Sequence, residues 1–203
     1  MERFLINPKN ISLKTVAKAT NKTLVNVPSG LGRFQRPTIL ALRVTEASMK
    51  SYKFELFADY FQVYLMDTEA DDDTSEVWTD EALNLKLGVL PNTLAVGTFR
   101  NVDVPVEVEI YDSEPDINLK EWDHASKGYF TIKSGSCAVF GCTDYLPDAA
   151  KIEIKPGAYA ALSLAKGLDS ITEEWEDADD IYRVILWPSS AKEYKALKAH
   201  GNT

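Results

Sequence analysis

The sequence has only two cysteines, two histidines and no long apolar run. Two cysteines are too few for a disulfide framework, so we expect reduced thiols and a cytoplasmic location. No apolar run approaches the roughly 20 residues that a membrane-spanning helix needs. The start, MERFLINPKN, lacks the apolar segment of a secretory signal. These absences predict a cytoplasmic protein without a membrane partner.

The chain also lacks a glycine-rich phosphate loop, an internal repeat and any regular alternation of strand and helix patterns. These absences argue against nucleotide-binding α/β folds. With 203 residues, 45% of them apolar and 10% aromatic, the chain is nevertheless long and apolar enough to build a real core. We therefore expect a globular protein of another class.

Acidic residues outnumber basic ones, giving a net charge of −9, and the two signs are unevenly distributed. Residues 1–66 hold 10 basic and 4 acidic residues, whereas residues 67–203 hold 12 basic and 27 acidic residues. The acidic part would repel bare nucleic acid and attract cationic proteins. A basic protein partner without direct nucleic-acid binding is the prediction, although acidic loops that serve only solubility remain the alternative.

Short runs rich in Val, Ile, Tyr and Phe recur between turn signals, which is typical of β-structure. The predicted strands cover residues 38–45, 52–67, 93–100, 104–112, 128–133, 137–141, 151–155, 158–165 and 181–188. A short helix is predicted after Thr79, its N-cap candidate, and ends at Gly88. Such a series indicates an all-β fold, an antiparallel β-sandwich of about nine strands or an open barrel, with short peripheral helices.

Composition divides the chain into three segments. Residues 1–37 form a basic N-terminal arm, with a short helix predicted over 13–22. Residues 38–188 are the predicted sandwich, and residues 189–203 are predicted as a C-terminal helix and tail.

Catalytic and metal chemistry find little support. Only His124 is a credible base for a Cys142 nucleophile, and no nucleophile motif surrounds either cysteine. The spacing of Cys137 and Cys142 does not match zinc ligands and places the two thiols on opposite faces of a strand. We predict a protein that is not an enzyme and has no catalytic residue, resident metal or cofactor.

The segment GCTDYLPDA (141–149) is interpreted as a turn between strands, with Tyr145 packed over the end of the sandwich. Two acidic segments, DTEADDD (67–73) and EEWEDADD (173–180), could together bind calcium if they meet at one end. A calcium- or small-ligand-binding sandwich module is therefore the alternative function.

A tryptophan within an acidic loop suggests a hot spot for a basic partner. We predict Trp175 as the anchor and the surrounding carboxylates as its electrostatic complement, whereas Trp78 and Trp122 are expected to cover the fold. The predicted partner-binding residues are Asp71, Asp72, Asp73, Glu76, Glu173, Glu174, Trp175, Glu176, Asp177 and Asp179.

Residues 54–188 resemble the bacterial competence protein J family, the DNA-entry nuclease inhibitors. The segments ADYFQVYLMD and VWTDEALNLKLGVLPNTLAVGTFRNVDVPVEVEIYD carry the likeness. EWDH, GCTDYLPDA, IEIKPGAYAALSLA and DDIYRVILWP resemble a broader group of bacterial proteins with the same fold.

The resemblance implies a small β-sandwich that binds and blocks a nuclease, and it implies no catalytic residue. The basic arm departs from the family pattern. The combined hypothesis is a bacterial nuclease inhibitor or immunity protein, as in a toxin–antitoxin pair; the sequence leaves a homodimer open.

Overall fold

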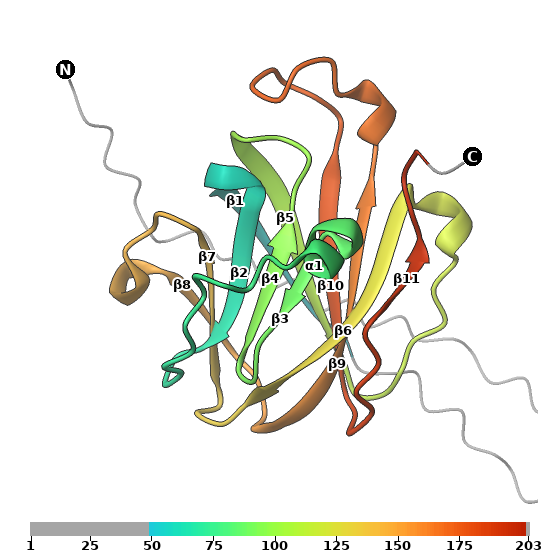
Figure 1. The fold of residues 1–203 in the computed structure, drawn as a ribbon. Helices are drawn as coiled ribbons and strands as arrows, with labels where there is room; N and C mark the ends of the chain where they lie inside the picture. The colour runs from blue at the N-terminus through green and yellow to red at the C-terminus, as the bar shows by residue number, and fades with distance from the viewer. Residues whose placement is uncertain (1–48, 202–203) are drawn as a thin grey trace, which may run out of the picture. The chain divides into compact units, whose positions relative to one another are not determined.

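The computed structural model describes residues 49–201, which fold into two β-sheets and one short α-helix (Figure 1). The all-β prediction is confirmed. The predicted arm (1–37), its helix (13–22) and the strand predicted over 38–45 lie outside the described residues. Within the described part, no helix combines the length and apolar character needed to span a membrane.

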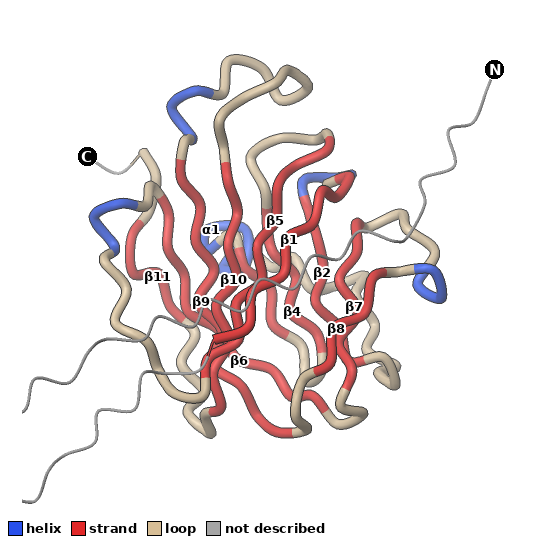
Figure 2. The backbone as a smooth tube through the Cα atoms, turned by 180° about the vertical axis from the view of Figure 1, so that it is seen from behind, coloured by secondary structure: helices blue, strands red, loops and turns tan. Residues whose placement is uncertain are grey.

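The larger sheet has six strands in the spatial order β1-β5-β10-β9-β6-β11. These are β1 (Met49–Phe57), β5 (Asp103–Tyr111), β10 (Ile181–Pro188), β9 (Gly157–Lys166), β6 (His124–Ile132) and β11 (Lys195–Lys198). The smaller sheet has five strands in the order β3-β4-β2-β7-β8. These are β3 (Leu87–Val89), β4 (Thr93–Gly97), β2 (Gln62–Asp67), β7 (Ser136–Gly141) and β8 (Ala150–Glu153). Figure 2 shows the two sheets from behind as separate layers.

The prediction of a purely antiparallel fold is wrong at one pair. β10 runs parallel to β5, while every other pairing is antiparallel within the described strands. After β9 the chain turns back and inserts β10 between β9 and β5, so its direction is set by β9. Hydrophobic alternation cannot distinguish parallel from antiparallel neighbours, because it reports only which face is buried.

The aromatic run predicted as one strand over 52–67 is two strands in different sheets. β1 ends at Phe57, and β2 begins at Gln62 after a short 3-10 turn over Asp59–Phe61. The chain thus crosses from the six-stranded sheet to the five-stranded sheet at this corner. No glycine or proline marks the break.

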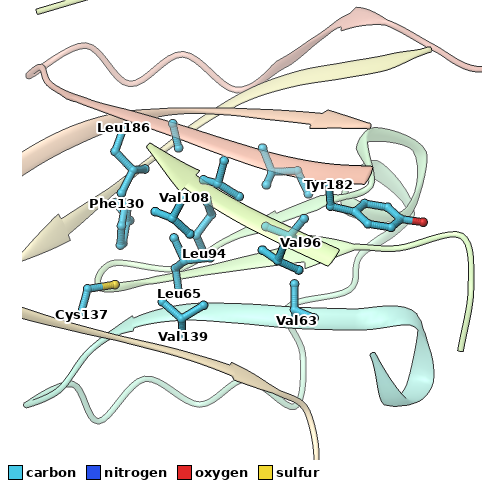
Figure 3. Packing of buried hydrophobic residues seen from close by; sticks show 14 of the residues in the cluster. Val63, Leu65, Leu94, Val96, Val108, Phe130, Cys137, Val139, Tyr182 and Leu186 are labelled. Carbon is cyan, nitrogen blue, oxygen red and sulfur yellow. The ribbon is translucent and has the colours of Figure 1, made fainter. Parts of the chain in front are cut away.

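The main core lies between the two sheets. Val63 and Leu65 of β2 and Val108 of β5 are fully buried in it (Figure 3). Along β5 the valines face this core, whereas Pro105 on the other face is exposed and Glu109 on that face is buried. Burial of each such side chain contributes roughly 1.5–3 kcal/mol.

Both outer faces are also apolar and are covered by connecting segments. Trp122 packs with Leu162 and Trp187 over the six-stranded sheet. Val77 and Leu146 pack against the outer face of the five-stranded sheet, over a cluster that includes Tyr64, Met66 and Phe140. All six residues of β2 are therefore buried, which obscures the alternation expected of a half-exposed strand.

The helix α1 (Asp80–Leu85) begins as predicted, because the Thr79 hydroxyl accepts a hydrogen bond from the Ala82 amide at 3.2 Å. It ends earlier than expected, at Lys86, which has a left-handed backbone with φ of 50°. Gly88 lies instead in β3, where a Cβ would come within 2.6 Å of a Val77 methyl.

The C-terminal helix predicted after residue 188 is wrong. The described residues there contain β11, which pairs with β6 at the edge of the six-stranded sheet. The Lys198 ammonium also donates a hydrogen bond to the Trp122 carbonyl. The local sequence favours a helix, but an available sheet edge outweighs weak helix propensity.

His124 joins β6 to the end of α1. The Ser126 hydroxyl donates to the Leu85 carbonyl at 2.6 Å, and His124 Nε2 lies 2.9 Å from the same oxygen. His124 is only 4% exposed, and burial lowers its pKa, aided by the charges of Lys86 and His200, although the Leu85 contact opposes this shift. The neutral imidazole is thus the form that the fold accommodates.

We predict that the free energy of unfolding falls as pH decreases below about 6.5, the ordinary histidine pKa. Unfolded His124 gains a proton there that buried His124 resists, with a slope of at most about 1.4 kcal/mol per pH unit. Urea titrations between about pH 7 and pH 5 should show a weaker dependence in His124→Gln. An equal dependence in both proteins would show that other groups are responsible.

Candidate functional site

The segment 172–179 carries most of the predicted binding residues. It connects the 3-10 turn Leu168–Ser170 to β10, and we call it the Trp175 loop. The Trp175 side chain is 63% exposed. The predicted carboxylates of this loop, all exposed, are Glu173, Glu174, Glu176, Asp177 and Asp179.

A buried arginine anchors the Trp175 loop from beneath. Arg100 forms an ion pair with Asp180 at 2.6 Å, and both side chains are almost completely buried. Its guanidinium also donates to the Glu176 carbonyl at 2.8 Å, and the Asn101 amide donates to the Glu174 carbonyl at 2.8 Å. The hydrogen bond to Asp180 raises the pKa of Arg100, although burial opposes that shift. The loop backbone is therefore fixed while its side chains face outward.

The two ends of the segment are also held together. Gly167 has φ of 77°, and a Cβ at this position would lie 2.3 Å from the Asp179 carbonyl oxygen. The Asp179 amide donates to the Ser170 hydroxyl at 2.9 Å. Only glycine suits this left-handed close approach, so the loop has a defined closed base.

The second predicted acidic segment is used differently. Asp72 accepts hydrogen bonds from the Asn92 backbone amide at 2.7 Å and side-chain amide at 3.1 Å. Asp73 accepts from the Ser75 amide at 2.9 Å, which lowers the pKa of Asp73. Asp71 and Glu76 are exposed. Part of this segment's charge thus stabilises its own conformation.

The two acidic segments lie at opposite ends of β2 (Figure 1). Asp67, at one end, accepts from the Ser134 amide at 2.9 Å. At the other end, the Thr98 amide donates to the Phe61 carbonyl at 2.8 Å, close in sequence to Arg100. The predicted partner-binding residues therefore form two separate groups rather than one.

This separation overturns the calcium hypothesis as it was framed. That hypothesis required residues 67–73 and 173–180 to meet at one end. Within the part of the chain that the structure describes, no group of three His, Cys, Asp or Glu side chains is placed to hold a metal ion.

Two further aromatic side chains are strongly exposed outside the Trp175 loop. Tyr60 is 70% exposed in the β1–β2 corner, and Tyr145 is 71% exposed in the β7–β8 connection. The Ala58 amide donates to the Val102 carbonyl at 2.9 Å. Val102 follows Asn101, whose amide binds the Trp175 loop at Glu174. The Tyr60 corner is therefore connected to the base of the Trp175 loop.

The sequence interpretation of GCTDYLPDA is correct in one respect and wrong in another. Residues 141–149 connect β7 to β8, and Asp144 accepts from the Gly141 amide at 2.7 Å, as expected of a turn. Tyr145 does not pack over the fold. Leu146 takes that place instead, since it contacts the outer apolar cluster.

Tyr60 and Phe61 are held in an unfavourable backbone conformation. Their φ angles are 55° and 61°, in the left-handed region. Such a conformation costs a non-glycine residue roughly 1–2 kcal/mol. The turn is maintained by hydrogen bonds from the Phe61 amide to Ala58 at 2.9 Å and from Thr98 to Phe61 at 2.8 Å. Strain that persists beside an exposed aromatic side chain is a pointer to function.

A shallow depression of about 350 Å³ adjoins Tyr60. It is lined by Tyr60, Phe61, Gln62, Trp78, Leu83, Lys86 and Gly97. The buried Gln62 carbonyl accepts from the Tyr64 hydroxyl at 2.8 Å and from the Trp78 indole. Trp78 therefore covers the sheet, as predicted, rather than forming an exposed anchor.

The structure does not join Cys142 to His124. Cys142 Sγ accepts from the Gln62 side chain at 3.1 Å, whereas His124 contacts Leu85 and Ser126. Burial raises the pKa of the Cys142 thiol, assisted by Asp59. Cys137 lies in the main core, where burial raises its pKa to about 12. Neither thiol has the lowered pKa of a nucleophile.

The comparison with solved structures finds two similar chains. One is ComJ, inhibitor of the DNA-degrading activity of NucA, from Bacillus subtilis: the TM-score is 0.56 at 14% identity, covering 70% of this chain and 100% of that chain. The other is crocagin biosynthetic gene J, with a TM-score of 0.48 at 14% identity, covering 70% of this chain and 99% of that chain. No protein-family model and no curated protein matches the sequence. The ComJ similarity confirms the fold that the resemblance implied; family membership stays a prediction.

We predict that Arg100→Met lowers the free energy of unfolding by about 3–5 kcal/mol, because Asp180 is left buried without a cation. Denaturant titration measures this change. Arg183→Met is the control: Arg183 pairs with Glu107 at 2.5 Å but its side chain is 28% exposed, so about 1 kcal/mol is expected. Replacing both Arg100 and Asp180 with apolar residues should restore much of the loss. Equal losses at Arg100 and Arg183 would contradict the anchoring role.

We predict that Tyr60→Gly raises the free energy of unfolding by about 0.5–1 kcal/mol, since glycine relieves the left-handed strain. Tyr145→Gly is the control: Tyr145 is equally exposed but has φ of −77°. Glycine there should destabilise by about 0.5–1 kcal/mol through the entropy of the unfolded chain. The same sign of change in both variants would show that the corner is not strained.

Proposed function

We propose that this protein is a non-enzymatic inhibitor or immunity protein that binds and blocks a basic bacterial partner, a nuclease or toxin. The observation that carries the proposal is the Trp175 loop, in which exposed carboxylates surround an exposed indole on a backbone fixed by Arg100. Aromatic anchors with complementary charge are typical of protein-binding hot spots. Such a complex would form in the cytoplasm.

Inhibition would be by occlusion. Enzymes that act on nucleic acids hold phosphates with lysine and arginine side chains. Glu173, Glu174 and Asp177 would pair with these cations and exclude the substrate, while the indole of Trp175 supplies the apolar contact. A preformed loop lowers the ordering cost of binding, and the acidic surface accelerates encounter with a basic partner.

The similarity to ComJ supports this function only as a compatible fold. ComJ inhibits the DNA-degrading activity of NucA, and it aligns over its full length with this chain at 14% identity. The inhibitor role therefore depends on the charge and geometry of the Trp175 loop.

The two acidic groups differ in how many of their carboxylates already accept hydrogen bonds. Asp72 and Asp73 already accept hydrogen bonds within their own segment. The Trp175 loop presents exposed carboxylates beside an exposed indole. We propose that the Trp175 loop binds the partner and that Asp71, Asp72, Asp73 and Glu76 contribute through the long-range field.

The first experiment is capture of partners from an extract of the source bacterium at low and high salt, using the full chain. Proteins released by salt are identified and assayed for nuclease activity with and without the purified chain. A salt-released nuclease that the chain inhibits supports the function. A captured enzyme that remains fully active in its presence contradicts it.

We predict that replacing Glu173, Glu174 and Asp177 with lysine slows association with that partner by about tenfold or more and reduces the salt dependence. The matched control replaces the exposed residues Glu69, Asp71 and Glu76 with lysine, changing net charge equally in the connection between β2 and α1. Stopped-flow or surface-based kinetics measures both. Equal effects of the two triple variants would place the binding surface elsewhere.

A further inference from the structure

The four edges of the two sheets differ greatly in length and regularity. β3 has three residues, β8 has four, and β11 has four with an irregular register against β6. β1 has nine residues and pairs with β5 along its whole length without a shift. Among the described residues, no strand pairs with the other side of β1. Long, regular edges are the ones that accept another strand.

The side chains of β1 are incompletely covered. Tyr52, Phe54 and Leu56 pack against the main core from the edge and are only partly buried. Lys53, Glu55 and Phe57 alternate with them on the other face and are exposed. An added strand would complete the burial of the first set and give the second set direct neighbours.

The charge of β1 differs from that of the acidic surface elsewhere. Its charged residues are Lys50, Lys53 and Glu55. The Lys53 ammonium lies 2.5 Å from Glu107, yet its side chain is 77% exposed and accessible to a second partner. An edge with both signs of charge can approach its own copy without the repulsion that an acidic surface would cause.

We propose that β1 pairs with β1 of a second copy of this chain, antiparallel about a two-fold axis at Phe54. In this register Lys53 faces Glu55 of the second copy. The two-fold symmetry also places Glu55 of the first copy opposite Lys53 of the second. On the inner face Phe54 meets its own counterpart and Tyr52 meets Leu56. The two six-stranded sheets then form one continuous sheet, with charge pairs on one face and apolar pairs on the other.

Neighbouring registers are less favourable for a stated reason. Directly opposed residues share a face, so an axis at Lys53 sets two lysines against each other. An axis at Glu55 likewise sets two glutamates against each other. Like charges in direct opposition destabilise a strand pair. The alternation of β1 therefore selects the axis at Phe54.

The dimer is independent of the proposed inhibitor role, because its edge lies outside the Trp175 loop. Oligomeric state can be measured on the purified full chain without any partner. Sedimentation equilibrium over a range of concentrations is the readout, and hydrogen exchange of the β1 amides locates the contact.

The expected results come from a charge-swap series. The unmodified chain is dimeric; Lys53→Glu and Glu55→Lys each raise the dimer dissociation constant by about tenfold or more, since both symmetric pairs become repulsive. The double variant Lys53→Glu/Glu55→Lys restores dimerisation. Lys120→Glu, at an exposed position outside β1, is the control and leaves it unchanged.

Three results would overturn the proposal. One is a monomer at every concentration, including a monomer whose β1 amides are protected by its own chain. Another is a dimer insensitive to both single reversals. The third is a double variant no better than the single ones. Lys53→Glu also removes the ion pair between Lys53 and Glu107 within one chain, so thermal unfolding is used to confirm that this variant folds. Glu55→Lys tests the same intermolecular pair while the ion pair with Glu107 stays intact.

Discussion

Both outer faces of this sandwich are apolar, and that constraint determines what its connecting segments can do. Three long connections are used as covers: one holds Trp122, one holds Val77 and one holds Leu146. In these segments most apolar side chains cover a sheet, although Tyr145, beside Leu146, stays exposed. The Trp175 loop escapes this requirement, because its tip rests on polar contacts with Arg100 and Asn101. It can therefore carry an indole in solvent.

The ion pair between Arg100 and Asp180 connects the stability of the fold with the position of the Trp175 loop. A buried pair contributes little net stability when intact, but loss of one partner is costly. Here the same guanidinium also binds the loop carbonyl of Glu176, so folding of the sandwich and positioning of the loop depend on one side chain. The strained corner at Tyr60 follows a similar logic, since hydrogen bonds from the sheet maintain a conformation that the local sequence disfavours.

The sequence was sufficient for features governed by local chemistry. The Thr79 cap, the burial of Trp122 and the turn within residues 141–149 follow from local residue patterns, and the structure has them. Features that depend on distant neighbours were not accessible. Three such features depend on which sheet edge is free: the parallel pairing of β10 with β5, the break before β2 and the strand β11. The positions of the acidic segments at opposite ends of β2 likewise require the three-dimensional path, and exposed Tyr60 and Tyr145 had no distinguishing local signal.

The four tryptophans differ sharply in their surroundings. Trp122 and Trp187 are 5% and 4% exposed and Trp78 is half-buried, whereas Trp175 is 63% exposed. The protein consequently contains its own optical reporter at the place where binding is proposed. A soluble quencher such as acrylamide reaches the indole of Trp175 before the others. Occupancy of the Trp175 loop would then appear as a blue shift and a loss of quenching in the natural fluorescence, without any attached dye.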